Sequence, residues 1–307
     1  MIELITHAIT LAVSLAALAG ASHFTIKSVE DLMELTGLSE ASTGFAALAW
    51  MTSMPEMTVA AFAVYQGTPG ISVGDILGSN VFNIGIVVGI MAILGSLKAC
   101  RTELLTELVD ILFLSSLIPL LLVMFKVASP LVGIMLLGIY AFSVYRMTKR
   151  RIPGALVPGI QKPNKMTIII KIIGGMTVVI VAARFAVLSA SYIAYLFGVP
   201  PILIGAKIIA IGTSLPELAL DLTAAKRGRV ELAIGDVIGS NLTNITLVLG
   251  FVLLVSPFAV DITTFTEILP FVLVTTLILW RYLTKGRISP TGGIVLVMVY
   301  ILFQAIL

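Results

Sequence analysis

Two carboxylates that directly follow prolines are the groups in this sequence best placed to do chemistry. Glu56 follows Pro55, and Glu217 follows Pro216, in both cases inside a long apolar stretch. A proline within a helix removes a backbone N–H and displaces the carbonyl four residues earlier, so nearby carbonyls can turn toward a cavity. An acidic side chain at the centre of a membrane helix costs roughly 2.5–3.5 kcal/mol. Two of them need a counter-charge, which a bound cation would supply.

Further oxygen-bearing side chains accompany these glutamates. Ser79 and Asn83 are four residues apart, as are Ser240 and Asn244, so each pair lies on one face of a helix. Carboxylate, hydroxyl, amide and carbonyl oxygens are hard ligands, which suit Ca²⁺ or Na⁺ and do not suit zinc or copper. The sequence therefore predicts a cation site drawn from the side chains of Glu56, Glu217, Ser53, Ser214, Ser79, Ser240, Asn83 and Asn244 and the carbonyls of Ala49, Thr52, Ala210 and Thr213.

These residues belong to a segment that the chain carries twice. Residues 49–89 match residues 210–250 at a constant offset of 161 without a gap, and 16 of the 41 positions are identical. Such a repeat indicates a duplication, and a duplication fixes the architecture because both copies should fold alike.

The composition indicates a membrane protein. Hydrophobic residues make up 59% of the chain and charged residues 11%, against about 25% charged in soluble domains. The single cysteine, Cys100, excludes an intramolecular disulfide. Apolar runs of about 20 residues mark transmembrane helices. They predict an all-α integral membrane protein with ten spans, at residues 4–22, 42–65, 72–96, 104–125, 129–148, 166–190, 201–225, 232–255, 264–282 and 290–307.

The basic residues predict the orientation of these spans. Of the 19 Lys and Arg residues, 16 fall in or next to the loops that follow the odd-numbered spans. The positive-inside rule therefore places both termini on the extracellular side of the cell membrane. Because each copy has five spans, the second copy crosses upside down, an arrangement typical of transporters with broken helices at the midplane. The predicted parts are a first repeat at 1–152, a cytoplasmic linker at 153–165 and an inverted repeat at 166–307.

Both copies of the motif T-S-x-P-E followed by G-S-N-x-x-N resemble the alpha repeats of the cation/Ca²⁺ exchanger superfamily, most closely the prokaryotic sodium/calcium exchangers. The resemblance implies an antiporter that exchanges Na⁺ for Ca²⁺ by alternating access, with helices 4–22 and 166–190 sliding over the core. It implies that the two glutamates bind Ca²⁺ and share in Na⁺ binding. The Na⁺ sites would use the four serines and the carbonyls of Ala49 and Ala210, the carbonyls of Thr52 and Thr213 would join the Ca²⁺ shell, and Asn83 and Asn244 would line the centre.

Several positions depart from the family pattern. Met51 stands where the second copy has Gly212 and the family usually has Gly, which would narrow one side of the site. Asp75 and Asp236 replace the Asn of many relatives. They could attract cations at the two mouths, or could stabilise helix N-termini. Asn244 is uncharged where potassium-dependent relatives carry Asp, so no K⁺ co-transport is expected.

Three other charges lie in or near the apolar runs. Lys207 either snorkels to the outer surface or provides a fixed cation near the outer path. Asp221 is expected to form an ion pair with Lys226 or Arg227 at the inner face rather than to act as a ligand, and the sequence suggests no role for Arg184.

Two other functions remain open. An H⁺/Ca²⁺ antiporter of the same fold would use the same glutamates as proton carriers, which makes H⁺ a further candidate ion. A cation channel would also line its path with oxygens, although inverted repeats favour alternating access. No phosphate loop, nucleophile triad or nucleic-acid module is visible, so we expect no enzyme, no cofactor and no nucleic-acid partner, only ions and membrane lipid. The oligomeric state is not indicated.

Overall fold

The computed structural model describes residues 2–33, 49–95, 97, 103–125, 129–149, 165–256 and 262–307, and within these ranges all regular structure is helical. The predicted linker at 153–165 lies outside the described residues except for its last position, Lys165, which begins a helix. The first part of the span predicted at 42–65 also lies outside them.

The helices fall into two series. The first contains α1 (Ile2–Met33), α3 (Ala49–Thr52), α4 (Met54–Tyr65), α5 (Pro69–Phe82), η2 (Asn83–Val88), α6 (Gly89–Ile93), α7 (Glu103–Leu117), α8 (Leu120–Phe125) and α9 (Pro130–Lys149). The second contains α10 (Lys165–Phe197), α11 (Pro201–Ile204), η3 (Gly205–Ile209), α12 (Ala210–Thr213), α13 (Leu215–Lys226), α14 (Val230–Thr243), η4 (Asn244–Val248), α15 (Leu249–Val255), α16 (Ile262–Thr284) and α17 (Pro290–Ile306). The η segments are π-helical turns, which often occur at functional sites.

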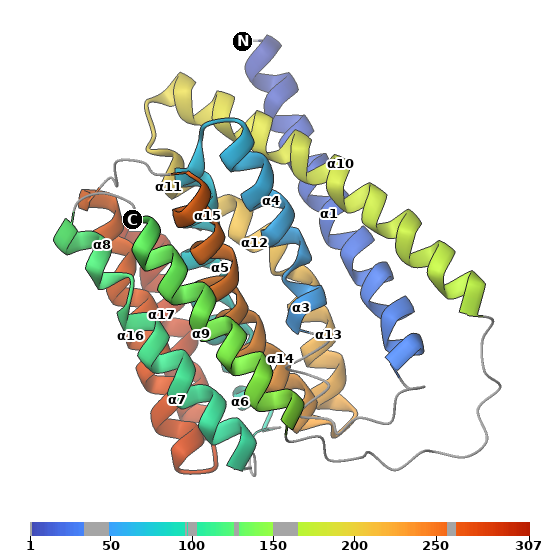
Figure 1. The fold of residues 1–307 in the computed structure, drawn as a ribbon, viewed down its shortest axis with the longest axis vertical. Coiled ribbons are helices and arrows are strands. Elements are labelled where there is room, and N and C mark those ends of the chain that lie inside the picture. The colour runs from blue at the N-terminus through green and yellow to red at the C-terminus, as the bar shows by residue number, and fades with distance from the viewer. Residues whose placement is uncertain are drawn as a thin grey trace.

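The duplication is visible in the helix boundaries. Helices α12, α13 and α14 begin and end 161 residues after α3, α4 and α5. In Figure 1 the chain rises through α3 and α4 and descends through α12 and α13, so these matching segments run in opposite directions.

The structure supports a membrane-spanning fold with fewer clear spans than the sequence predicts. Six helical stretches in the described residues are long and apolar enough to cross a membrane: Ile2–Ala21, Pro69–Ile93, Glu103–Met124, Met166–Phe197, Val230–Val255 and Thr264–Thr284. A seventh is the pair Pro201–Thr213 and Leu215–Lys226, which is bent by 42°. The apolar helices Pro130–Arg146 and Pro290–Ile306 are shorter. Each of these nine stretches overlaps a predicted span.

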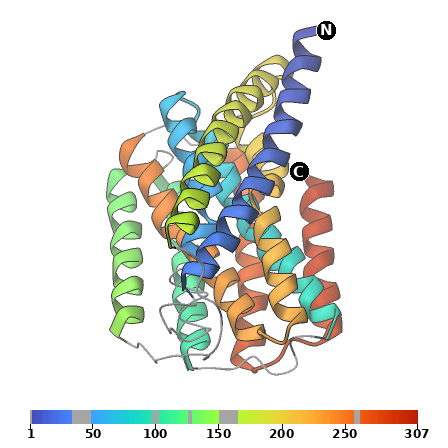
Figure 2. The same ribbon diagram turned by 90° about the vertical axis from the view of Figure 1, so that its right-hand side faces the viewer.

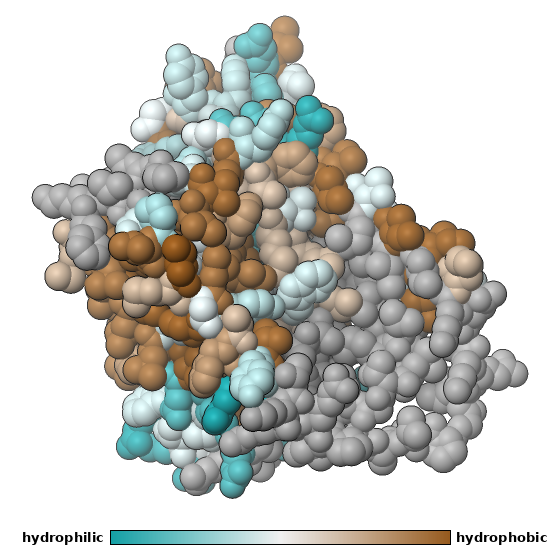
Figure 3. All heavy atoms as spheres, viewed as in Figure 1, coloured by the Kyte–Doolittle hydropathy of each residue, from teal (hydrophilic) through white to brown (hydrophobic). Residues whose placement is uncertain are grey.

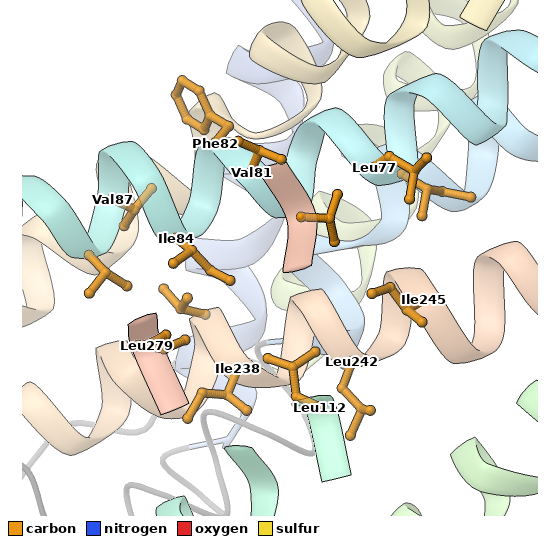
Figure 4. Close-up of a cluster of buried hydrophobic side chains, with 14 of the residues drawn as sticks. Leu77, Val81, Phe82, Ile84, Val87, Leu112, Ile238, Leu242, Ile245 and Leu279 are labelled. Atoms are coloured by element: carbon orange, nitrogen blue, oxygen red, sulfur yellow. The ribbon is translucent and has the colours of Figure 1, made fainter. Parts of the chain in front are cut away.

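The two helical stretches after the broken segments form the centre of the molecule. In the most apolar 18-residue window of Pro69–Ile93 and of Val230–Val255, 83% of the residues are buried, against 17% in that of Ile2–Ala21. Their apolar side chains, among them Leu77, Ile84, Ile238 and Leu242, pack between the two stretches and against α7 and α16 (Figure 4). Helices α1 and α10 lie side by side on one flank of this centre (Figure 1, Figure 2).

Glycines let the repeats approach closely at the centre. A Cβ atom on Gly74 would lie 1.9 Å from the carbonyl oxygen of Ile202, and one on Gly78 would lie 2.2 Å from that of Ala206. Only glycine fits at these two positions of α5, so α5 packs directly on the backbone of α11 and η3. On the described part of the face in Figure 3, hydrophobic side chains form a band across the middle, with hydrophilic ones toward both ends.

Candidate ion-binding site

Each copy contains a helix that is broken at a serine. Ser53 separates α3 from α4 with φ −77° and ψ 2°, and Ser214 separates α12 from α13 with φ −91° and ψ 3°. Pro55 and Pro216 stand at the start of the second helix of each pair, where a missing N–H costs little. Glu56 and Glu217 therefore lie in a first helical turn, where the positive end of the helix dipole stabilises a negatively charged side chain.

The backbone at these breaks differs from the sequence-based prediction in one respect. The carbonyl of Ala49 accepts the N–H of Ser53 at 3.2 Å, and the carbonyl of Ala210 accepts that of Ser214 at 3.1 Å. The prolines instead leave the carbonyls of Met51 and Gly212 without their usual donor, so the hydrogen bonds to the Ala49 and Ala210 carbonyls survive the break. These two carbonyls are thus not freed, and each also accepts from a threonine hydroxyl, that of Thr52 at 3.4 Å and that of Thr213 at 3.2 Å.

Hydroxyl groups connect the first glutamate to the second copy. The Oγ of Ser79 lies 3.4 Å from Glu56 Oε1, 3.4 Å from Asp75 Oδ1 and 3.2 Å from Thr213 Oγ1. The hydroxyl of Thr213 also donates to Asp75 Oδ1 at 2.9 Å. Helix α5 thus presents a serine and an aspartate to a glutamate of its own copy and a threonine of the other.

The corresponding contacts occur around the second copy. The Oγ1 of Thr52 lies 2.7 Å from Ser240 Oγ and donates to Asp236 Oδ1 at 3.3 Å. The threonine of each copy therefore contacts the aspartate and the serine of the other copy. Glu217 has no such donor, because neither of its carboxylate oxygens has a hydrogen-bond partner.

Four asparagines link the two central helices just beyond these clusters. Asn80 Nδ2 donates to the carbonyl of Asn241 at 3.2 Å, and Asn241 Nδ2 donates to the carbonyl of Asn80 at 3.5 Å. Asn83 Nδ2 donates to Asn241 Oδ1 at 3.1 Å, and Asn244 Nδ2 donates to Asn80 Oδ1 at 3.4 Å. This asparagine clamp of Asn80, Asn83, Asn241 and Asn244 joins α5 and η2 to α14 and η4.

The centre contains many buried oxygens without a hydrogen-bond donor. All the serine, threonine, glutamate and asparagine side chains of the predicted site are fully buried. A buried polar atom without a hydrogen bond is costly, and a buried charge is far more so. A hard cation supplies the missing partner for such oxygens, and no described Lys or Arg forms an ion pair with either glutamate. The oxygens are Ser53 Oγ, Ser214 Oγ, Glu56 Oε2, Glu217 Oε1 and Oε2, Asn83 Oδ1 and Asn244 Oδ1.

Several residues of this centre were not predicted from the sequence as part of it. Asp75 and Asp236 are fully buried and contact the site threonines, so they do not lie at the two mouths. The sequence could have identified them, because they stand four residues before Ser79 and Ser240 and so lie on the same helix face. Asn80 and Asn241 were harder to identify, because only their presence in both copies of the motif distinguished them.

Two of the other charges can now be placed. The Nζ of Lys207 donates to the carbonyl of Gln304 at 3.1 Å, which fixes its amine against α17. The predicted ion pair of Asp221 is wrong. Asp221 is fully buried and both of its oxygens lack a hydrogen-bond partner, whereas Lys226 and Arg227 are exposed at the end of α13.

The fold and the buried oxygen cluster define a membrane protein with an oxygen-lined centre between two matching halves. The family profile described as "Sodium/calcium exchanger protein" matches residues 6–149 and 167–307. The chain belongs to this family.

Individual relatives agree with this assignment. The sodium/calcium exchanger MaX1 of Methanosarcina acetivorans is 27% identical, and the match covers 97% of each chain. The putative antiporter CaxA of Alkalimonas amylolytica is 32% identical over 71% of each chain. Among solved structures, the sodium-calcium exchanger NCX_Mj soaked with Na⁺ and Sr²⁺ superposes with a TM-score of 0.72 at 26% identity, covering 99% of both chains.

Proposed function

We propose that this chain exchanges Na⁺ for Ca²⁺ across the cell membrane by alternating access. The observation that carries the proposal is the pair of fully buried glutamates, Glu56 and Glu217, whose carboxylates retain oxygens without donors at the meeting point of the two copies. Two carboxylates offset the charge of one Ca²⁺, and the same oxygens can take Na⁺. Relatives of this chain that are named sodium/calcium exchangers support the choice of ions.

The proposed ligands are divided between the two ions. Glu56 and Glu217 bind Ca²⁺ together with the carbonyls of Thr52 and Thr213, and they share in Na⁺ binding. The Na⁺ ions also use Ser53, Ser79, Ser214 and Ser240 and the carbonyls of Ala49 and Ala210, which would exchange their threonine hydroxyl contacts for the ion. Asn83 and Asn244 line the central position with their donor-free amide oxygens.

The proposed architecture has ten spans in two inverted five-helix repeats, with both termini extracellular. The opposite directions of α3–α4 and α12–α13 support the inversion (Figure 1). Helices α1 and α10 slide over the core to change access. Their low burial and their position together on one flank support this role, since neither is enclosed by the central helices.

Uptake of ⁴⁵Ca²⁺ into vesicles that contain the purified protein tests the proposed exchange. Uptake should follow an imposed Na⁺ gradient, and K⁺ should have no effect because Asn244 carries no charge to offset it. Uptake that follows only a pH gradient would select the H⁺/Ca²⁺ antiporter, and single-channel currents in a bilayer would select a channel.

Labelling of single cysteines tests the proposed orientation. In a Cys100→Ala background, Gln66→Cys should react only with reagents added outside, and Lys285→Cys only with reagents that reach the cytoplasm. Both positions are exposed at helix ends, so reagent access depends on the side of the membrane alone. The reverse pattern of labelling would overturn the orientation.

A further inference from the structure

A buried acidic pair lies beside the central site. Asp221 is on α13, four residues after Glu217, and Asp236 is on α14, four residues before Ser240. Both aspartates are fully buried on helices that pack against each other, and their carboxyl groups are close enough to interact electrostatically. Four residues of an α-helix rise about 6 Å, so the pair forms a layer one helical turn away from Glu217 and Ser240.

Asp221 lacks the partners that a buried carboxylate needs. Neither of its oxygens accepts a hydrogen bond, and no described Lys or Arg forms an ion pair with it. The basic residues at the end of the same helix, Lys226 and Arg227, are exposed. A carboxylate in this position is strongly unfavourable by itself, and the facing Asp236 carboxylate adds repulsion. A cation between the two carboxylates removes both penalties.

The atoms around the pair determine which cation fits. Besides the two carboxylates, the hydroxyl of Thr52 lies 3.3 Å from Asp236 Oδ1 and 2.7 Å from Ser240 Oγ. The two carboxylates and this hydroxyl are all oxygen ligands. Such a set suits hard ions and disfavours transition metals.

The first copy has no equivalent pair. The position that corresponds to Asp221 is Ala60, so no aspartate at that position faces Asp75, the equivalent of Asp236. That residue, Asp75, receives the hydroxyl of Thr213 at 2.9 Å. The paired carboxylates therefore occur on one side of the central site only.

We propose that Asp221 and Asp236, with the hydroxyl of Thr52, form a second site for a hard cation, Na⁺ or Ca²⁺, one helical turn from the central site. The inference extends the proposed function, and with the proposed orientation this site lies on the cytoplasmic side. An ion arriving from the cytoplasm would bind there before it reaches Glu217.

Equilibrium binding of ²²Na⁺ and of ⁴⁵Ca²⁺ to the purified full-length protein tests the proposal. In the double variant Glu56→Gln, Glu217→Gln, the charges of the central site are removed, and one cation per chain should remain bound. Adding Asp221→Asn, or separately Asp236→Asn, should abolish this residual binding. The matched control Glu231→Gln makes the same chemical change at an exposed position of α14 and should leave it intact. Residual ²²Na⁺ or residual ⁴⁵Ca²⁺ identifies which ion the site takes.

The single variant Asp221→Asn, with both glutamates present, should lose one bound cation and keep the others. The proposal is overturned if the double variant binds neither ion, if residual binding survives both aspartate substitutions, or if Asp221→Asn alone abolishes all binding. Failure of the proposed function would look different. A wild-type protein without Na⁺-driven Ca²⁺ uptake that still binds an Asp221-dependent cation would contradict exchange and leave this site in place.

Discussion

The two copies of the repeated segment have the same fold but differ in buried charge and in the packing at their helix breaks. The first copy places Glu56 beside the hydroxyl of Ser79, whereas Glu217 in the second copy has no donor. The second copy also carries Asp221, where the first has Ala60. The second copy therefore has one buried carboxylate more than the first, and its glutamate lacks the hydroxyl donor that Glu56 has.

The copies differ again where the flanking helices meet the breaks. Gly212 lies against Leu15 of α1, so closely that an added Cβ would be 2.6 Å from Leu15 Cδ2. The matching residue, Met51, is half-buried and has a long side chain. The duplication thus supplies two similar half-sites, while single substitutions make the two sides of the molecule unequal. In a transporter that opens to both sides of the membrane, such differences between the half-sites can make ion binding from one side differ from ion binding from the other.

The largest expected effect tests what the copies share. Glu56→Gln and Glu217→Gln keep the size of the side chain but remove a charge that faces the ion. Each should reduce Na⁺-driven ⁴⁵Ca²⁺ uptake by about 100-fold, since a charge-assisted contact contributes up to about 3 kcal/mol. Glu231→Gln, at an exposed position, should leave uptake unchanged. Near-normal uptake in either glutamate variant would show that the two half-sites do not act together.

A smaller effect is expected where the copies differ. Gly212→Met should crowd Leu15 and lower the free energy of unfolding by about 1–3 kcal/mol, the usual cost of overpacking. It should also slow exchange, because α1 must move past this point. The reverse change, Met51→Gly, should cost about 1 kcal/mol through the low helix propensity of glycine. Denaturation in detergent and initial uptake rates measure both.

Leu15→Ala provides the control for this crowding. Combined with Gly212→Met, it should recover part of the lost stability, because the shorter side chain makes room. If the double variant is no better than Gly212→Met alone, the close contact between α1 and α12 does not explain the cost.

The sequence predicted the overall class well, because the class depends on local patterns. Apolar runs and the constant offset of the repeat identify membrane helices, and the Pro-Glu pairs locate the breaks. The contacts between copies could not be predicted in the same way. That Thr213 faces Asp75, or that Asp221 faces Asp236, depends on how two distant segments pack. The hydrogen bond to the Ala49 carbonyl was misjudged because a proline disturbs only the carbonyl four residues before it.

The smallest expected effect concerns the asparagine clamp, where the copies are most alike. Asn80→Ala removes the bond to the Asn241 carbonyl and the bond that Asn80 Oδ1 accepts from Asn244. Asn241→Ala likewise removes the bond to the Asn80 carbonyl and the bond that Asn241 Oδ1 accepts from Asn83. Each should lower the free energy of unfolding by about 1–2 kcal/mol, and by similar amounts, because each residue donates to the other's carbonyl. The double variant should cost less than the sum of the single variants, with a coupling of about 1 kcal/mol in a double-mutant cycle measured by denaturation in detergent. Additive effects would mean that the two amides act independently, and very unequal single effects would mean that the clamp shares the asymmetry of the rest of the site.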